Sequence, residues 1–283
     1  MNGCVLRSVD KMKETVIDIN DLQEMFPALR TPLGRVLGCR FLRSIGMEKV
    51  NEAHSNHCCL RGAAFTTALL ADPLIDICYR LHHKERLASL PEGAFITVSN
   101  HPTGSIEGIM LIDIFARRRA DFRVMANGFL TRIGAMEENF IPVVPSSSRH
   151  EDKKANIVAI RQCLEHLNAG NPLGFFPAGS VSFLRWGKIR DLAWSENVMR
   201  IIRKAAVPVY PVYFDVRNTS FFYLLGSLDW RMRVLRMPTE TFNKRGKTVD
   251  VFVGEPLSAN DVRQIPDDKT LATLLYGRTY DRN

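Results

Sequence analysis

Apolar runs of strand length alternate with amphipathic stretches from residue 91 onward. The apolar runs are rich in β-branched and aromatic residues, which favour strands, and they cover 94–98, 122–126, 140–144, 173–176, 207–214 and 248–253. Helical patterns lie between them at 106–118, 151–169 and 195–205. Strands that alternate with helices predict an α/β fold in which a mixed, largely parallel sheet is flanked by helices.

The first 90 residues have a different pattern and are predicted to form an N-terminal helical layer. Segment 32–43 has apolar residues at helical spacing and several arginines, and Pro32 suits the start of a helix. Two interpretations are open for this segment: a helix that lies in a membrane interface, or a helix packed on the core. No linker or repeat follows it, so residues 1–90 and 91–283 are predicted to form one structural domain.

Length and composition narrow the class of protein. A chain of 283 residues that is 46% hydrophobic can bury a full core. No apolar run approaches the roughly eighteen residues that span a bilayer. The charged start also lacks the apolar segment of a signal peptide. We therefore expect a peripheral protein at the cytoplasmic face of the membrane, with no transmembrane segment.

The net charge of +8 favours anionic partners. Basic residues are grouped at 117–119, 185–190, 231–236 and 244–247. Because no nucleic-acid-binding signature accompanies them, an anionic membrane surface is the predicted partner and nucleic acid is not. Histidines and cysteines at 54–59 superficially suggest a metal cluster, but no second cluster is present and no metal is expected.

The turn after the strand at 94–98 carries the main candidate for chemistry. His101 stands at the exit of this strand, where catalytic groups gather in α/β sheets, and Glu107 follows six residues later. A carboxylate that holds a histidine ring fixes its tautomer and stabilises the imidazolium, so such a pair acts as a general base. Structural interpretations stay open: His101 as a hydrogen-bonded turn residue, Glu107 as a first-turn acid, Ser105 as an N-cap and Gly104 at a positive φ.

Three further stretches follow in the order of a known family's motifs. Asn100-His101-Pro102-Thr103-Gly104-Ser105-Ile106-Glu107-Gly108 precedes Val124 to Val144, Phe175-Phe176-Pro177-Ala178-Gly179-Ser180-Val181-Ser182 and Val207-Pro208-Val209-Tyr210-Pro211-Val212-Tyr213. This ordered set, within about residues 90–260, resembles the glycerolipid (lysophospholipid) acyltransferases. The first motif is most similar to a bacterial branch often labelled as haemolysins, which includes O-acyltransferases of ornithine- and glycine-type aminolipids.

The resemblance implies that His101, supported by Glu107, deprotonates a lysolipid hydroxyl. The hydroxyl would attack the thioester of an acyl carrier protein or of acyl-CoA, which is a co-substrate, and no bound cofactor is expected. Backbone amides at Gly179 and Ser180 are candidates for stabilising the tetrahedral oxyanion. The residues predicted to bind substrate are Asn100, Gly104, Arg132, Pro177, Gly179, Ser180, Ser182 and Arg185.

Two departures from the family pattern bear on this expectation. Five residues separate His101 from Glu107, one more than in the common motif, and glutamate reaches one methylene further than the usual aspartate. Phosphate-using members have a glutamate and an arginine where this chain has Ala178 and Val181. Because an arginine fork is the usual device for binding phosphate, its absence favours an aminolipid-type acceptor over lysophosphatidate. Arg185 and the nearby Lys188 remain open as alternative cations that could bind a phosphate in place of the missing arginine.

Two other functions are weighed against acyl transfer. A serine esterase or lipase would use Ser180 or Ser182, but the sequence has no Gly-x-Ser-x-Gly elbow. A non-catalytic lipid-binding or membrane-lytic protein is the third hypothesis, and the missing signal peptide counts against secreted lysis. Segments 221–226 and 230–235 mix aromatic, aliphatic and basic residues. This mixture suits a membrane-facing surface or acyl-chain tunnel, or equally a buried helix pair with snorkelling arginines.

Overall fold

The computed structural model describes residues 13–143, 152–185 and 187–282. Most of the charged N-terminal start, on which the expectation of no signal peptide rests, lies outside these ranges. The strands are β1 (Cys78–His82), β2 (Ile96–Ser99), β3 (Arg123–Asn127), β4 (Phe140–Val143), β5 (Leu173–Phe175), β6 (Phe183–Arg185), β7 (Lys188–Arg190), β8 (Val209–Asp215) and β9 (Thr248–Val253).

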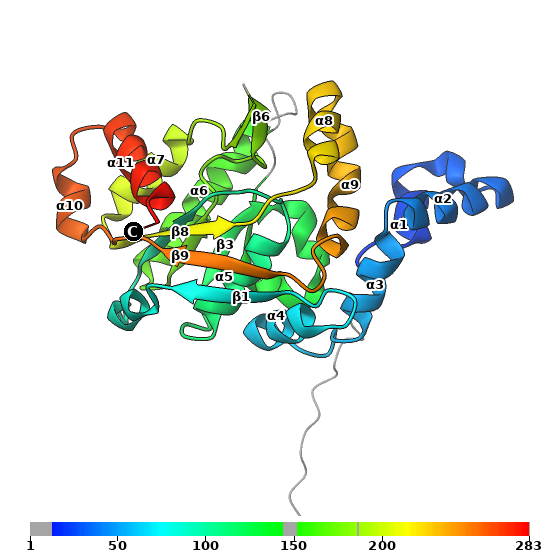
Figure 1. The fold of residues 1–283 in the computed structure, drawn as a ribbon, viewed down its shortest axis with the longest axis horizontal. Helices are drawn as coiled ribbons and strands as arrows, with labels where there is room; N and C mark the ends of the chain where they lie inside the picture. The colour runs from blue at the N-terminus through cyan, green and yellow to red at the C-terminus, as the bar shows by residue number, and fades with distance from the viewer. Residues whose placement is uncertain (1–12, 144–151, 186, 283) are drawn as a thin grey trace, which may run out of the picture.

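Seven of these strands form one sheet in the order β1-β9-β8-β2-β5-β3-β4 (Figure 1). β8, β2, β5, β3 and β4 run parallel to one another, and β9 pairs antiparallel with β8 and parallel with β1. β6 and β7 form a separate antiparallel hairpin. The predicted α/β fold with a mixed, largely parallel sheet is confirmed.

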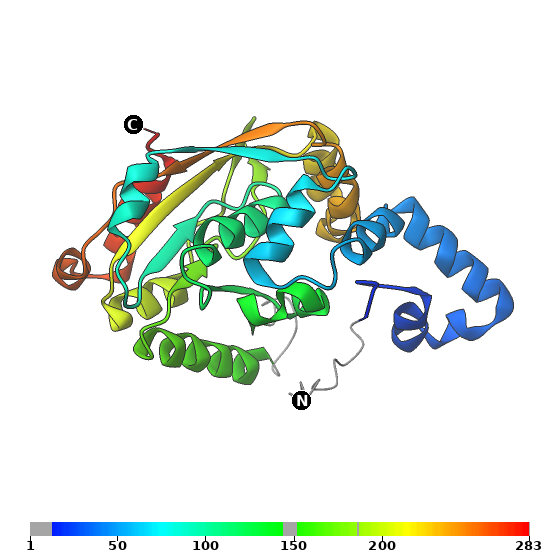
Figure 2. The ribbon, with the colours of Figure 1, turned by 90° about the horizontal axis from the view of Figure 1, so that it is seen from below.

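Helices cover both faces of the sheet (Figure 2). They are α1 (Ile19–Met25), α2 (Pro32–Ser44), α3 (Met47–Ser55), α4 (Gly62–Ala71), α5 (Ile106–Ala116), α6 (Asp152–Asn168), α7 (Glu196–Ala205), α8 (Ser220–Leu228), α9 (Trp230–Phe242), α10 (Ala259–Gln264) and α11 (Asp268–Tyr280). Short 3₁₀ helices are η1 (Pro27–Arg30), η2 (Lys84–Ser89), η3 (Gly128–Arg132) and η4 (Gly134–Asn139). The pattern along the chain did not predict α10, α11 or the β6–β7 hairpin.

Two hydrophobic cores lie on the two faces of the sheet. One contains side chains of α4 and α5, and the other contains side chains of α6, α7 and α11. Neighbouring residues such as Phe95 and Ile96 belong to different cores, because successive side chains of an extended chain point to opposite faces. All four residues of β2 are buried, as expected for a central strand covered on both sides. The end of β2 therefore delivers the next residues to a fixed point at the edge of the sheet.

The N-terminal helices α1 to α3 form an arm beside the body of the protein (Figures 1 and 2). The arm has its own small core, which includes Leu22, Leu42 and Met47. The pattern of the predicted helical layer over residues 1–90 did not mark β1, which pairs with β9 at the edge of the sheet. β1 has the mixed polar sequence Cys-Tyr-Arg-Leu-His and a partner that is distant in the chain, so no local apolar pattern marks it as a strand. None of the described helices combines the length and the apolar character needed to cross a membrane.

Candidate active site

The turn after β2 places His101 beside Glu107. Nδ1 of His101 lies 2.9 Å from Oε1 of Glu107, so the extra residue in the turn does not separate the pair. The Glu107 side chain is completely buried, whereas 21% of the His101 side chain is exposed. The two side chains are therefore in direct contact. The imidazole is thus anchored on its buried side.

Glu107 folds back from the first turn of α5 to bind the turn that precedes it. Its carboxylate accepts hydrogen bonds from the backbone N–H groups of Thr103 (2.9 Å), Gly104 (2.7 Å) and Ser105 (3.3 Å), and from the Thr103 hydroxyl. Ser105 occupies the N-cap position but caps no amide with its side chain, because its hydroxyl pairs with that of Thr241. The carboxylate therefore satisfies backbone donors that a helix start would otherwise leave free.

The surroundings of Glu107 keep its carboxyl group ionised. Burial alone would raise the pKa of this group. The contacts with His101, the Thr103 hydroxyl and the Gly104 amide outweigh burial and lower the pKa of Glu107 to about 2. Glu107 is therefore a carboxylate at neutral pH and can stabilise a protonated imidazole beside it.

The third stretch of the ordered motif set, Phe175 to Ser182 (the third motif), reaches the same turn from the neighbouring strand β5. β5 is parallel to β2, so the residues after both strands emerge at one edge of the sheet. The ring of Phe176 packs against the ring of His101, with 4.5 Å between their centroids and an interplanar angle of 31°. Ser182 donates from its backbone N–H to the carbonyl oxygen of His101 at 2.8 Å. The structure thus brings the first and third motifs together.

Asn100 and Gly104, both predicted to bind substrate, have contacts that shape the turn. The Asn100 side chain donates to the carbonyl of Phe214 (3.0 Å) and accepts from its N–H (2.8 Å), which ties the end of β2 to β8. Gly104 has a φ of +86°, and a Cβ there would lie 2.6 Å from Val181 and 2.8 Å from Met237. Only glycine fits this left-handed and crowded position.

Pro177, Gly179 and Ser180 lie in the loop after β5. The amide of Gly179 donates to the carbonyl of Phe176 at 2.9 Å, within the loop itself, so its role as an oxyanion donor stays a prediction. Pro177 is buried, and its carbonyl accepts from the Ser195 amide. The Ser180 amide has no hydrogen bond within the described parts of the chain, and it remains a candidate donor as well.

Arg132 and Arg185 belong to elements other than the turn that carries His101 and Glu107. Nη1 of Arg132, in η3, is 3.1 Å from a carboxylate oxygen of Asp21, an interaction that links the body of the protein to the N-terminal arm. Arg185 is exposed on β6, at the outer part of the hairpin. Contact of either arginine with substrate stays a prediction.

A buried arginine that the sequence pattern did not single out supports the third motif. Arg233 of α9 is only 4% exposed, donates to the Val181 carbonyl (3.3 Å) and the Ser180 hydroxyl (3.0 Å), and stacks 3.7 Å from the ring of Phe183. Burial lowers the pKa of Arg233. In the sequence Arg233 stands among exposed apolar and basic residues, so nothing local distinguishes it. α8 and α9 bury one face against the body of the protein and expose the other, and contact of the exposed face with a membrane stays a prediction.

A second polar network, which the sequence pattern did not single out either, contacts the backbone of the same turn. The Asn218 side chain donates to the carbonyl of Thr103 at 3.0 Å, and Nζ of Lys244 donates to Oδ1 of Asn218 at 2.6 Å. Burial lowers the pKa of Lys244 to about 8, against the opposing charges of Glu240 and Glu107. In the sequence, Lys244 belongs to a basic run that resembles a solvated surface. Only the tertiary structure shows that it is 2% exposed.

A serine esterase would need a catalytic base hydrogen-bonded to Ser180 or Ser182, and the contacts of these two serines supply none within the described residues. Ser182 Oγ donates to a carboxylate oxygen of Asp191 (2.5 Å) and to the carbonyl oxygen of His101 (3.2 Å), and Ser180 Oγ accepts from Arg233. Within the described ranges, neither hydroxyl is hydrogen-bonded to an imidazole. Across the same residues, no group of three or more histidine, cysteine or acidic side chains is arranged to hold a metal ion.

The fold and the site together define an α/β protein with a histidine–carboxylate pair at the end of a central strand. A sequence model described as an acyltransferase matches residues 22–280. Because this match covers most of the chain, the chain belongs to that acyltransferase family. The family membership predicted from the ordered motifs is confirmed.

The chain is also similar to individual proteins of known name and to a solved structure. The chain is 27% identical over 179 residues to a lyso-glycine lipid O-acyltransferase of Phocaeicola vulgatus, which covers 60% of this chain and 62% of that protein. It is 28% identical over 179 residues to a protein of the same name from Bacteroides thetaiotaomicron, covering 60% and 64%. The matched segment thus spans less than two thirds of either relative. A solved structure, the 1-acyl-sn-glycerophosphate acyltransferase PlsC of Thermotoga maritima, is 17% identical, covers 77% of this chain and 75% of that one, and has a TM-score of 0.47.

Proposed function

We propose that this protein is a lysolipid O-acyltransferase in which His101 is the general base and Glu107 supports it. The observation that carries the proposal is the 2.9 Å contact between Nδ1 of His101 and Oε1 of Glu107 at the end of β2, in a chain of the acyltransferase family. The partial exposure of the His101 ring leaves it accessible to a substrate.

The proposed reaction moves an acyl group from sulfur to oxygen. Nε2 of His101 takes the proton of the lysolipid hydroxyl as its oxygen attacks the thioester carbonyl carbon. The carboxylate of Glu107 stabilises the imidazolium that forms. When the tetrahedral intermediate collapses, the carbon–sulfur bond breaks and the imidazolium returns its proton to the thiolate. The products are an ester, a free thiol and neutral His101, so no covalent enzyme intermediate is needed.

An aminolipid-type acceptor, of the lyso-glycine lipid class, agrees best with the third motif. Both curated relatives are named for acyl transfer to lyso-glycine lipid. Val181 stands where phosphate-using members carry an arginine, and it is buried in an apolar cluster with Phe222, Tyr223 and Met237. The buried Arg233 donates to the Val181 carbonyl and stacks on the ring of Phe183 in the same loop. These features support an acceptor that does not depend on a phosphate clamp.

The acyl donor is proposed to be the thioester of acyl carrier protein or of coenzyme A. Both carry phosphate groups, and an acyl carrier protein is acidic. The β6–β7 hairpin starts next to the site and exposes Arg185, Lys188 and Arg190. These cations are suited to attract an anionic donor.

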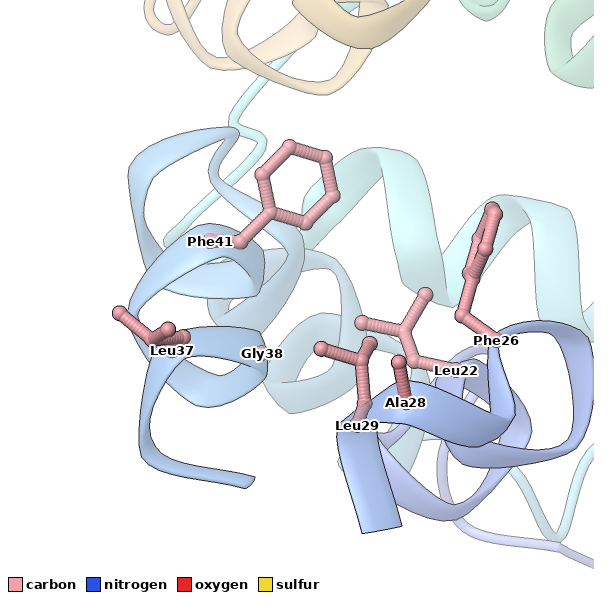
Figure 3. Close-up of a pocket in the computed structure, with 7 residues that line it drawn as sticks. All are labelled: Leu22, Phe26, Ala28, Leu29, Leu37, Gly38 and Phe41. Atoms are coloured by element: carbon pink, nitrogen blue, oxygen red, sulfur yellow. The ribbon is translucent and has the colours of Figure 1, made fainter. Parts of the chain in front are cut away.

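A peripheral membrane location is part of the proposal. α2 exposes Leu33, Val36, Leu37 and Phe41 together with arginines, and α8 and α9 expose Phe221, Leu224, Leu228 and Trp230. Apolar side chains interleaved with cations favour binding to an anionic bilayer. An apolar groove of about 440 Å³ lies in the N-terminal arm. Its lining residues, shown in Figure 3, are Leu22, Phe26, Ala28, Leu29, Leu37, Gly38 and Phe41.

An acyl-transfer assay tests the enzymatic proposal. Purified protein is incubated with labelled acyl carrier protein thioester or acyl-CoA and a panel containing lyso-glycine lipid, lyso-ornithine lipid and lysophosphatidate, and products are identified by mass spectrometry. We expect a diacylated aminolipid from the wild type, and a loss of about 10³-fold in rate for His101→Ala with the fold retained. Transfer by folded His101→Ala at the wild-type rate would overturn the assignment of the base. A preference for lysophosphatidate would overturn the acceptor class.

Vesicle sedimentation tests the location. Leu33→Asp and Leu37→Asp change side chains that are 70% and 52% exposed, so the fold should tolerate them. We expect both variants to bind vesicles of phosphatidylglycerol and phosphatidylcholine more weakly than the wild type. Leu274→Asp, at a site 37% exposed on α11, is the matched control and should bind like the wild type. Equal binding by all four proteins would remove α2 from the membrane surface.

A further inference from the structure

The β6–β7 hairpin begins and ends next to the backbone of His101, in the turn after β2. Ser182 immediately precedes β6, and Asp191 immediately follows β7. Both residues contact the backbone of His101. The hairpin is therefore attached to the turn after β2 at each of its two base residues, although these residues lie 81 and 90 positions away in the chain.

The two base residues satisfy both backbone groups of His101. The amide N–H of His101 points between the oxygens of Asp191, at 3.3 Å from each. The carbonyl oxygen of His101 accepts from the Ser182 amide at 2.8 Å and from the Ser182 hydroxyl at 3.2 Å. The Ser182 hydroxyl also contacts Oδ1 of Asp191 at 2.5 Å, which links the two base residues to each other. His101 is thus held on either side of its Cα.

This arrangement complements the contact that Glu107 makes with the ring. Glu107 contacts one nitrogen of the imidazole and the turn amides from Thr103 to Ser105, but it makes no contact with the backbone of His101 itself. Asp191 and Ser182 restrain that backbone and hence the direction of the Cα–Cβ bond. A displacement of about 1 Å at a reacting group can cost about 10²-fold in rate, so restraint at this point has a catalytic consequence.

We propose that Asp191, acting with Ser182, is a positioning residue that fixes the peptide of His101 in the orientation needed for acyl transfer. The proposal rests on the proposed function for its kinetic consequence, and on the hydrogen bonds alone for its structural one. The carboxyl group of Asp191 has three partners: the Ser182 hydroxyl, the His101 amide and the Tyr280 side chain. Burial raises the pKa of Asp191 against the effect of these hydrogen bonds.

Two substitutions at Asp191 separate hydrogen bonding from packing. Asp191→Asn keeps an oxygen at Oδ1, which accepts from the Ser182 hydroxyl and from the His101 amide, and loses the oxygen at Oδ2, which contacts the same amide. Asp191→Ala removes both hydrogen bonds. Asp113→Asn is the control, because Asp113 is also a buried carboxylate, 1% exposed, whose partners Thr67 and Tyr79 lie away from the turn.

Steady-state kinetics provide the first readout. We expect Asp191→Ala to lower kcat about 10²-fold while KM for either substrate changes less than about twofold, and Asp191→Asn to recover kcat to within about fivefold of the wild type. Asp113→Asn should keep the wild-type kcat. A wild-type kcat in folded Asp191→Ala, or an Asn variant as impaired as the Ala variant, would overturn the proposal. If Asp191→Ala does not fold, Ser182→Ala replaces it, with an expected loss of about tenfold in kcat and the same overturning result.

Hydrogen–deuterium exchange of the His101 amide is the second readout and does not depend on activity. Exchange at this amide should accelerate at least about tenfold in Asp191→Ala, and stay at the wild-type rate in Asp191→Asn and Asp113→Asn. Unchanged exchange in the Ala variant overturns the positioning role. Wild-type protein that lacks acyl transfer but shows the expected exchange pattern overturns the proposed function and leaves the positioning role standing.

Discussion

Oε1 of Glu107 lies 2.9 Å from Nδ1 of His101 because the turn between them folds around the carboxylate. Thr103 and Gly104 donate to the same side chain that holds the histidine, so the longer turn is wrapped on Glu107 rather than stretched beside it. The extra methylene of glutamate and the extra residue of the turn therefore compensate for each other. This relationship leads to the first prediction.

Glu107→Asp should impair acyl transfer about as strongly as Glu107→Gln, by ten- to a hundredfold in kcat. The shorter carboxylate cannot bind Thr103 and Gly104 and also reach His101, whereas glutamine reaches all three but lacks the charge that stabilises the imidazolium. The measurement is kcat at saturating substrates for both variants, with thermal unfolding as a check on folding. Wild-type kcat in Glu107→Asp would contradict the geometric explanation.

Gly104→Ala should destabilise the protein, whereas Gly108→Ala should not. A methyl group at Gly104 meets Val181 and Met237 at 2.6 and 2.8 Å in a backbone with a φ of +86°, and a loss of about 2–4 kcal/mol is expected. Gly108 lies within α5, where a Cβ meets nothing within 4 Å. Alanine there should stabilise by about 0.5–1 kcal/mol. Urea unfolding of the two variants measures the difference, and equal free energies of unfolding would refute the prediction.

The stability of the protein should fall at acid pH in a window set by Glu107. Its pKa is lowered from 4.5 in the unfolded chain to about 2 in the folded protein. The stabilising contribution is therefore complete above pH 4.5 and is lost as the pH falls from 4.5 to 2. Its size is of the order of 3 kcal/mol. The difference in the free energy of unfolding between wild type and Glu107→Gln should shrink across this window, and a constant difference would contradict the assignment.

Lys244 should make the stability depend on pH in a second window, at alkaline pH. Burial lowers its pKa from 10.5 to about 8, so between these values the unfolded chain binds a proton that the folded protein does not. The stability should therefore rise with pH from 8 to 10.5, by about 3 kcal/mol, as the cost of a buried charge disappears. Lys244→Met removes this term. We expect the free energy of unfolding of the wild type, relative to Lys244→Met, to increase across the window; a flat difference would show that Lys244 does not titrate there.

The α/β architecture was predictable because each central strand carries its own signal. β2, β5 and β8 are buried on both faces and read as continuous apolar runs. β1 and the β6–β7 hairpin were not predictable. Their residues are largely exposed or half-buried, and their stability comes from partners elsewhere, such as β9 for β1. An edge strand or an exposed hairpin leaves little hydrophobic pattern to detect.

The candidate site also contains residues that were predictable from the sequence and residues that were not. His101 and Glu107 were found from the sequence because they belong to one local strand–turn–helix unit, and the order of the later motifs defined the family. Whether the pair meets was decided by the folding of the Thr103–Ser105 turn around the carboxylate. Asp191, Arg233 and Lys244 became part of the site only in three dimensions. Buried polar groups need partners, and which distant segment supplies the partner depends on how strands and helices pack rather than on any local pattern.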